Sequence, residues 1–343
     1  MDTLKPHIAV VILNWNGKKY LQQFLPSVIA HSESEAEIII ADNGSTDDSV
    51  SFLKETYPAL RVCCLGKNYG FAEGYNRALK EISASYYILL NSDVEVTRGW
   101  IQPMLHLMES DDTIAACQPR ILSLNQRTMF EYAGAAGGWI DRLGYPFCRG
   151  RIFETLETDK GQYDSISEVF WASGAAMMVR TDDFLGIGGF DDFFFAHQEE
   201  IDWCWRVKNN GKKVYVCPSS IVYHLGGGSL SHDNPRKLFL NYRNNLIMIW
   251  KNQSASEKSV TILLRMVLDG VAGIRFLLTG KLRYCFTIVE AHFSFYRWVL
   301  FEEKVKTANK PLNSHSGVYN GSIVWEYFAR GKKIFSDIVK IKK

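Results

Sequence analysis

Short apolar segments in the N-terminal part of the chain alternate with stretches of helical spacing. The apolar segments are residues 7–13, 37–42, 60–65 and 86–90. Apolar residues between them recur every three or four positions, over residues 20–28, from Asp47 or Asp48 as a cap to Tyr57, and over 71–82. Pro26 predicts a kink in the first of these helices. This alternation predicts βαβ units and a mostly parallel sheet with flanking helices.

The pattern is less regular after residue 97. We expect a helix over 100–109, and then a loop or a small antiparallel excursion over the Gly- and aromatic-rich residues 132–150. A strand over 175–179, a loop over 186–196, a helix over 199–209 stopped by Gly211 and a strand over 213–217 follow. Long helical runs begin after Pro235. The sequence therefore predicts a domain over 1–235 and a helical, basic C-terminal extension over 236–343.

Charge is distributed unevenly along the chain, although the net charge is only +2. Residues 251–343 carry 16 Lys and Arg against 7 Asp and Glu, whereas residues 1–250 carry 23 against 30. A basic tail on an acidic body indicates an anionic partner for the tail. The chain has no zinc-finger or helix-turn-helix signature, so we expect no nucleic acid.

Cysteine usage and the N-terminus indicate a protein of the cytoplasm. The seven cysteines include no Cys-x-x-Cys pair, which argues against a disulfide framework or a zinc ribbon. A reducing compartment fits this composition. The apolar run of residues 8–13 is too short for a signal peptide.

Asp93 follows the most apolar of the predicted strands, in the sequence Asn91-Ser92-Asp93. Ligands of open α/β sheets bind beyond the carboxyl ends of the strands. Asp93 can hold a hard cation such as Mg²⁺ or Mn²⁺ there. The alternative is an Asx turn that only closes the strand.

Two earlier strands also end in polar turns. Asp42 can accept a hydrogen bond from the N3–H of a pyrimidine, and Gly44 permits close backbone approach. A turn followed by a helix cap is the alternative. Backbone groups in the turn of Asn14 and Asn16 can grip a nucleoside.

The helix that starts near Asn68 is a third candidate. Backbone N–H groups at its start, with Asn76 or Arg77 one turn in, can face a nucleotide or its phosphates. Alternatively, Gly70 and Gly74 only allow tight packing.

Glu199 and Glu200 are adjacent carboxylates at a predicted helix start. One can cap the helix, and the other is then free to act as a base. Adjacent like charges raise the pKa of one member, which suits proton abstraction. Asp202 and Arg206 lie four residues apart, and we expect an ordinary helical ion pair between them.

His224 follows an apolar run and precedes Gly226, Gly227 and Gly228. It is either a structural histidine or a ligand for a divalent ion, which neutral imidazole binds well. The glycines allow backbone contact with phosphates and the opening of a lid.

Taken together, these segments resemble an inverting family 2 glycosyltransferase with the A-type, Rossmann-like fold, and are most similar to bacterial surface-polysaccharide rhamnosyltransferases and galactofuranosyltransferases. The resemblance covers residues 7 to about 250. Its parts, in chain order, are Leu13-Asn14-Trp15-Asn16-Gly17, Asp42-Asn43-Gly44-Ser45-Thr46-Asp47, Asn68-Tyr69-Gly70-Phe71-Ala72, Asn91-Ser92-Asp93, Gly188-Gly189-Phe190-Asp191, Glu199-Glu200-x-Asp202 and His224.

The resemblance implies roles for individual residues. Asp42 would read the base, Asp93 would bind the metal on the donor diphosphate with His224 as a further ligand, and Glu200 would be the general base. The remaining donor contacts are expected from Asn14, Asn16, Asn43, Asn68, Arg77, Asn91 and Ser92. Two departures are evident. The family's Asp-x-Asp is Asn91-Ser92-Asp93 here, and its Glu-Asp pair is Glu199-Glu200, so the choice of base between the two remains open.

The implied reaction moves a sugar, with rhamnose or galactofuranose favoured, from a dTDP or UDP donor to a saccharide or lipid-linked acceptor. A divalent ion neutralises the leaving diphosphate, and one carboxylate base gives single displacement with inversion. The alternatives are a nucleotidyltransferase, or a non-catalytic subunit of a polysaccharide-assembly complex.

The residues from 257 to 279 predict an amphipathic helix that ends at Gly280. Its charged residues fall within an arc of about 120° at 100° per residue, and the remaining face is apolar. That face either packs on the first domain or meets lipid. The basic tail and the aromatic residues at 293–298 favour the inner face of the cell membrane as the docking surface.

Overall fold

The computed structural model describes residues 8–226, 234–302 and 310–340. A central sheet has the strand order β11-β13-β6-β12-β4-β1-β2-β3. The predicted N-terminal strands form its parallel half, with β1 flanked by β4 and β2, and β3 at the edge. Their bounds are Ile8–Asn14 (β1), Glu37–Asp42 (β2), Arg61–Cys64 (β3) and Tyr86–Asn91 (β4).

The other half of the sheet mixes strand directions. Strand β12 pairs antiparallel with both β4 and β6, and β13 runs parallel to β6. The short β5 pairs antiparallel with the end of β13 and sets His224 opposite Val94. The bounds are Val94–Val96 (β5), Ile114–Ser123 (β6), Ser167–Glu168 (β11), Ala176–Arg180 (β12) and Lys213–His224 (β13). The predicted α/β, Rossmann-like class is confirmed, with antiparallel pairing concentrated in this half.

Helices cover both faces of the sheet, because the buried β-strands alternate their side chains between two apolar layers. Val10 and Ile12 pack in one layer and Ala9 and Val11 in the other. The helices are Lys18–Ser32 (α1), Ser49–Thr56 (α2), Gly70–Lys80 (α3), Ile101–Ser110 (α4), Thr181–Gly186 (α5) and Glu199–Asn209 (α6). Helix α1 continues through Pro26 to Ser32.

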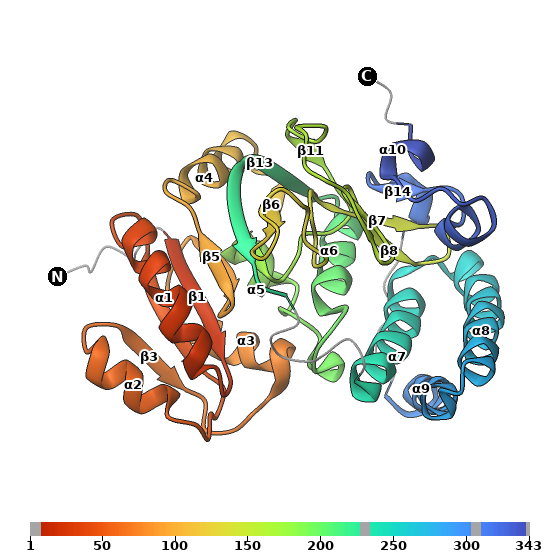
Figure 1. The fold of residues 1–343 in the computed structure, drawn as a ribbon, viewed down its shortest axis with the longest axis horizontal. Helices are drawn as coiled ribbons and strands as arrows, with labels where there is room; N and C mark the ends of the chain where they lie inside the picture. The colour runs from red at the N-terminus through yellow and green to blue at the C-terminus, as the bar shows by residue number, and fades with distance from the viewer. Residues whose placement is uncertain (1–7, 227–233, 303–309, 341–343) are drawn as a thin grey trace.

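A second, smaller sheet lies beside the first, between the central sheet and the C-terminal helices (Figure 1). It has the order β10-β9-β8-β7-β14, which confirms the antiparallel excursion predicted after residue 132. The bounds are Gly138–Asp141 (β7), Pro146–Cys148 (β8), Arg151–Ile152 (β9), Thr155–Leu156 (β10) and Val318–Tyr319 (β14). Strand β14 pairs parallel with β7. The C-terminal part of the chain therefore contributes to this sheet.

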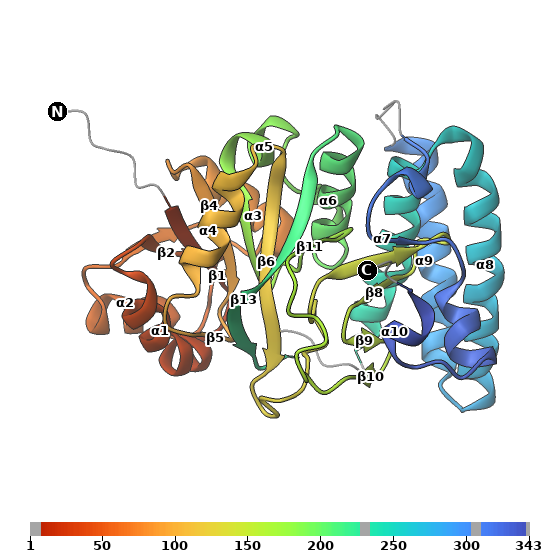
Figure 2. The same cartoon turned by 90° about the horizontal axis from the view of Figure 1, so that it is seen from above.

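The C-terminal extension is helical, as predicted. Helices α7 (Pro235–Asn252), α8 (Ala255–Leu278) and α9 (Leu282–Phe301) pack together, and α8 forms the outer edge of the molecule in both views (Figures 1 and 2). Short turns at Leu312–Ser314 (η2), Trp325–Ala329 (η3) and Phe335–Ile338 (α10) complete it. Among the described helices, none is long and apolar enough to cross a membrane. The domain boundary near 235 coincides with the start of α7 and stays a prediction.

Candidate active site

The carboxyl ends of β1 and β2 join through side chains. Asn14 and Asp42 are register partners, and the Asn14 amide donates to Asp42 Oδ2 at 3.1 Å and to Ser45 Oγ at 3.1 Å. The Ser45 N–H donates to Asp42 Oδ1 at 3.0 Å. Both oxygens of the buried Asp42 thus have a protein partner, and each retains a lone pair for a further donor.

Asn16 fastens the β1 loop to the β2 loop. Its Oδ1 accepts from the N–H of Thr46 at 2.7 Å and of Asp47 at 3.2 Å. Its backbone has a φ of 51°, a left-handed conformation that asparagine tolerates better than most residues. A Cβ on Gly17 would lie 2.4 Å from Asn14 Oδ1, so a larger residue there would displace the Asn14 side chain. The two loops form one unit.

Asn43 and Asn68 hold the start of α3. The Asn43 amide donates to the Gly70 carbonyl at 2.8 Å and its Oδ1 accepts from Tyr69 N–H at 3.0 Å, while Asn68 Oδ1 accepts from Gly70 N–H at 2.8 Å. Arg77 forms an exposed ion pair at 2.6 Å with Glu73, and its guanidinium lies 3.9 Å from the Tyr69 ring centroid. The two asparagines are therefore engaged in structure, and Arg77 lies at the surface beside them.

Asp93 and His224 meet because β5 pairs with the end of β13. Asp93 Oδ1 lies 3.1 Å from His224 Nε2, and both side chains are buried. The strand predicted to end at 217 continues to His224, across a register irregularity between Cys217 and Ile221. Glu131 contacts the other ring nitrogen, with Oε2 3.2 Å from His224 Nδ1. The imidazole is held between two carboxylates.

The charges in this cluster reinforce one another. Burial by itself lowers the pKa of His224, but Asp93 and Glu131 raise it overall to about 10. Burial raises the pKa of Glu131. The contacts with His224 and with the N–H groups of Tyr132 and Ala133 lower it by more than burial raises it, so the pKa of this carboxyl lies below its ordinary value. Glu131 was not predicted, since 93 residues separate it from His224 and no local pattern marks it.

The donor atoms of this cluster suit a divalent cation. A carboxylate oxygen fits Mg²⁺ and Mn²⁺, and a neutral imidazole nitrogen favours Mn²⁺ of the two. His224, protonated between its two carboxylates, would have to give up the proton on Nε2 before that nitrogen could bind an ion. Nucleotide enzymes often bind Mg²⁺ through one or two carboxylates together with substrate phosphates. Within the described ranges, no group of three or more His, Cys, Asp or Glu side chains is arranged as a metal site. An ion held by Asp93 and His224 would thus take its other ligands from a bound diphosphate and water.

Glu199 and Glu200 open α6, as predicted. Each has a buried Oε2 with no hydrogen-bond partner among the residues that the structure describes. Burial raises the pKa of Glu199 well above its ordinary value, and the neighbouring charge of Glu200 adds to this, while burial raises the pKa of Glu200 to about 7. Glu200 also lies beside Gly174, since a Cβ on that glycine would be 3.9 Å from Glu200 Cβ.

Gly174 connects Glu200 to the end of β4. The next residue, Ala175, accepts a hydrogen bond at 3.0 Å from the N–H of Asn91. Ser92 lies between Asn91 and Asp93, close to Gly17 of the β1 loop, where an added Cβ would be 3.6 Å from Ser92 Oγ. The predicted base and the predicted metal ligand thus lie at the same edge of the sheet.

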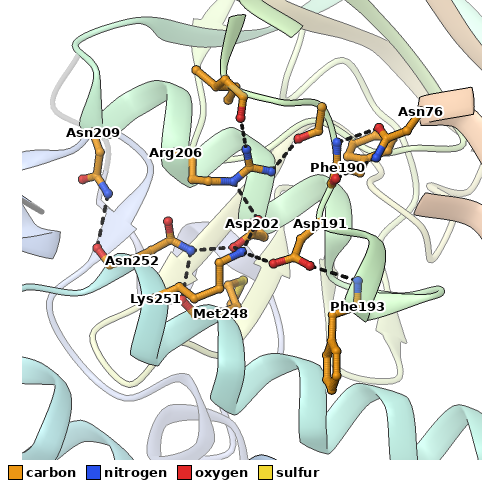
Figure 3. A network of polar contacts seen from close by, with 12 residues as sticks. Asn76, Phe190, Asp191, Phe193, Asp202, Arg206, Asn209, Met248, Lys251 and Asn252 are labelled. Carbon is orange, nitrogen blue, oxygen red and sulfur yellow. Dashed lines mark hydrogen bonds and ion pairs between the residues drawn. The ribbon is translucent and has the colours of Figure 1, made fainter. Parts of the chain in front are cut away.

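A buried network of charged and polar side chains holds α6 against α7 (Figure 3). The predicted ion pair is present, with Arg206 Nε donating to Asp202 Oδ2 at 2.8 Å. Lys251 Nζ of α7 lies 3.0 Å from Asp202 Oδ1, and the Asn252 amide donates to the same oxygen at 2.7 Å. Lys251 also pairs with Asp191, which caps the turn before α6. Sequence spacing revealed only the Arg206 contact, because the α7 residues lie about fifty positions away.

Helix α7 also holds the segment that leads into Glu199. The buried Asn244 amide donates to the carbonyls of Phe194 at 3.0 Å, Ala196 at 3.0 Å and His197 at 2.8 Å. The segment is strained, with φ values of 62° at Phe195, 69° at His197 and 75° at Gln198. Residues in such conformations persist only where their surroundings enforce them. Asn244 supplies part of that enforcement.

Comparison with known proteins bears on the family and the fold. Residues 9–165 match the model of the family Glycosyl transferase family 2. An N-acetylglucosaminyl-diphospho-decaprenol L-rhamnosyltransferase of Mycobacterium tuberculosis is 25% identical over 286 residues, which cover 78% of this chain and 91% of the relative. The rhamnosyltransferase WbbL of Escherichia coli is 25% identical over 241 residues, 66% of this chain and 85% of its own.

Solved structures show the same fold. TarS 1-349 of S. aureus in complex with UDP-GlcNAc superposes with a TM-score of 0.56 at 17% identity, covering 84% of this chain and 80% of that chain. GalNAc-T7 with UDP, GalNAc and Mn²⁺ gives 0.57 at 17% identity, over 74% of this chain and 49% of that chain. The resemblance inferred from the sequence motifs is confirmed, and so is the A-type glycosyltransferase fold.

Proposed function

We propose that this chain is a family 2 glycosyltransferase that transfers rhamnose or galactofuranose from a dTDP or UDP donor to a saccharide or lipid-linked acceptor, with inversion, in surface polysaccharide synthesis. Relatives named as rhamnosyltransferases support the choice of sugar. One of them is named for a diphospho-decaprenol acceptor, which supports a lipid-linked acceptor here. Such an acceptor would place the enzyme at the inner face of the cell membrane.

The observation that carries the proposal is the pair of carboxylates at the start of α6. Glu200 is only partly buried as a residue, has one buried oxygen without a partner in the described part of the chain, and has a pKa raised to about 7 by burial of its carboxyl. A general base with a pKa near the working pH is ionised in a large fraction of the molecules and still binds a proton strongly enough to remove it from a hydroxyl. Glu200 therefore serves as the general base. Its neighbour Glu199 has a pKa that burial and the charge of Glu200 raise well above the ordinary value.

In the proposed reaction Glu200 removes the proton from the acceptor hydroxyl. The hydroxyl oxygen forms a bond to the anomeric carbon, and the bond from that carbon to the diphosphate oxygen breaks, so that its electron pair leaves with the nucleoside diphosphate. Attack on the face opposite the leaving group inverts the anomeric centre.

The donor would lie across the ends of β1, β2 and β4. Asp42 accepts from the base, and the loops of Asn14, Asn16, Asn43, Asn68 and Arg77 surround the nucleoside. Asn91 and Ser92 then border the diphosphate. Asp93 and His224 would hold Mg²⁺ or Mn²⁺, which when bound neutralises charge on the leaving diphosphate.

A donor screen tests the proposal. The full chain with Mn²⁺ is mixed with dTDP-rhamnose, UDP-galactofuranose or other nucleotide sugars, and thermal unfolding is recorded. A ligand at 100 times its Kd adds about 2.7 kcal/mol. The stabilising donor is then offered with saccharide and polyprenyl-diphosphate acceptors, and nucleoside diphosphate release and anomeric configuration are measured.

The outcomes separate the alternatives. Acceptor-dependent release of nucleoside diphosphate with an inverted product is expected. Pyrophosphate release from a nucleoside triphosphate and a sugar phosphate would identify a nucleotidyltransferase instead. Binding without turnover or hydrolysis of any donor would identify a non-catalytic subunit.

A further inference from the structure

Helix α8 packs with its polar residues inward and its apolar residues outward. Arg265 and Asp269 are buried, with relative exposures of 3% and 1%. On the opposite face Leu263 is 64% exposed and Val267 59% exposed. The predicted amphipathic helix is thus confirmed, but its charged face is the one that packs on the body of the protein.

Buried polar contacts fix this rotation of α8. The Arg265 guanidinium donates to Asn245 Oδ1 of α7 and lies 3.6 Å from the Tyr145 ring centroid and 3.5 Å from Asp269. Asp269 also lies 3.1 Å from His292 of α9. Turning the apolar face inward would expose Arg265 and Asp269 to water and leave the polar groups of Tyr145, Asn245 and His292 facing apolar side chains, which is unfavourable. The outward apolar face is therefore the stable arrangement.

The apolar surface continues from α8 onto α9. Large apolar side chains are more than one third exposed at eight positions of α8 and at seven positions of α9. The most exposed on α9 include Phe286 at 70%, Phe293 at 72% and Leu300 at 74%. Single exposed apolar residues are ordinary, but a contiguous patch marks an interaction surface.

Charge indicates what covers this surface. Between Ser259 and Ile274 the charged residues of α8 are Arg265 and Asp269, both turned inward, so the exposed face of that stretch is uncharged. The charged residues around it are mainly basic, since Lys258, Arg275, Lys281, Arg283 and Arg297 outnumber Glu257, Glu290 and Glu302. A second copy of the chain would bring a border of like charge, whereas anionic lipid headgroups supply the opposite charge.

We propose that the exposed apolar face of α8 and α9 lies in the headgroup region of an anionic bilayer. This proposal rests on the proposed function in one respect: a lipid-linked acceptor would explain why the enzyme binds a membrane. A helix of this composition lies in the plane of the interface and buries its apolar face about 5–10 Å deep. Helix α7 joins the bundle to the segment before Glu199, so docking also sets the height of the site above the lipid.

Flotation of the full chain with vesicles tests the docking surface. The vesicles are phosphatidylcholine alone, or a mixture of phosphatidylcholine and phosphatidylglycerol, at low and high salt. A variant carries Leu263→Glu, Val267→Glu and Phe293→Glu. Its matched control carries Gln22→Glu, Ser51→Glu and Thr56→Glu, at exposed positions of α1 and α2, so that both gain the same charge.

The wild type and the control are expected to float with the anionic vesicles, less so at high salt. The α8/α9 variant is expected to lose at least about tenfold in bound fraction, because three apolar contacts with lipid become charged. Circular dichroism and donor hydrolysis, measured on the same preparations, check that the variant is folded and that the active site works.

Equal flotation of the variant and the control would overturn the proposed docking surface. Failure of the wild type to float with the anionic vesicles would overturn it as well. If the wild type forms a dimer and the α8/α9 variant is a monomer, the face is the contact with a second copy of the chain instead. Absence of donor turnover in the wild type would count against the proposed function alone, because flotation does not depend on it.

Discussion

Replacing Glu200 by glutamine removes a base while keeping the size and shape of the side chain. The loss of a general base typically lowers kcat by about 10²–10⁴, which corresponds to about 3–5 kcal/mol of activation free energy. Donor binding is expected to change little, because Glu200 lies beside Gly174 and Phe71 rather than in the loops of Asn14 and Asp42. The effect should therefore fall on kcat and leave the donor Kd intact.

The pH dependence gives a second signature of the same group. Burial raises the pKa of Glu200 to about 7, so as the proposed base it would be protonated and inactive below that pH and ionised above it. Activity of the wild type should rise as the pH increases through about 7. Residual activity of Glu200→Gln should lack this step. With its raised pKa, the Glu200 carboxyl stabilises the folded protein below the ordinary pKa of a glutamate, and this contribution is lost as the pH rises through about 7. Glutamine does not ionise, so Glu200→Gln should not destabilise the protein at higher pH.

Initial rates of nucleoside diphosphate release provide kcat and KM across pH, and calorimetric titration provides the donor Kd. Glu199→Gln is the matched control, since it makes the same change one residue earlier and is expected to retain most of the activity. The reasoning is refuted if Glu200→Gln keeps wild-type kcat. An inactive Glu199→Gln beside an active Glu200→Gln would exchange the two roles.

Three further changes test the surroundings of the base. Asp93→Ala should abolish metal-dependent turnover with the fold intact, and full activity of this variant in the presence of a chelator would contradict the assignment. Glu131→Gln should weaken Mn²⁺ binding by about 10- to 100-fold, measured by electron paramagnetic resonance, because Glu131 orients the His224 ring; unchanged Mn²⁺ affinity would make its contact merely structural. Lys251→Ala should lower the free energy of unfolding in urea by about 3 kcal/mol, because it leaves the buried Asp202 with fewer counter-charges; a loss below about 0.5 kcal/mol would show that Arg206 compensates alone.

Sequence patterns predicted the elements with strong periodicity well. The strands at 37–42 and 86–90 and the helix at 199–209 appear within one residue of the predicted ends. Strand β13 was predicted too short, because Pro218 and the two serines after it are typical of a turn. The structure accommodates them as an irregularity between Cys217 and Ile221, and the strand continues to His224. A strand can absorb extra residues when a neighbouring strand keeps its pairing on both sides.

Contacts made across long sequence separations could not be predicted in this way. The Asp202–Arg206 pair follows from helical spacing, whereas the contacts of Asp202 with Lys251 and Asn252 depend on how α7 packs. The same holds for Glu131 beside His224. Motif resemblance identified the loops that carry candidate residues, but not that Asn43 and Asn68 use their amides to fix the start of α3.

Helix α8 illustrates why the direction of an amphipathic face is not a local property. Periodicity separates its charged residues from its apolar residues, and the usual expectation for a globular protein puts the apolar side inward. Tyr145, Asn245 and His292 reverse that expectation, because together they form a polar site for Arg265 and Asp269. Since α7 contributes Asn245 to that site and Asn244 to the segment before Glu199, one helix connects the outward apolar face to the proposed base. A change in how α8 sits against α7 would therefore be expected to reach Glu199 and Glu200 through the carbonyls that Asn244 holds.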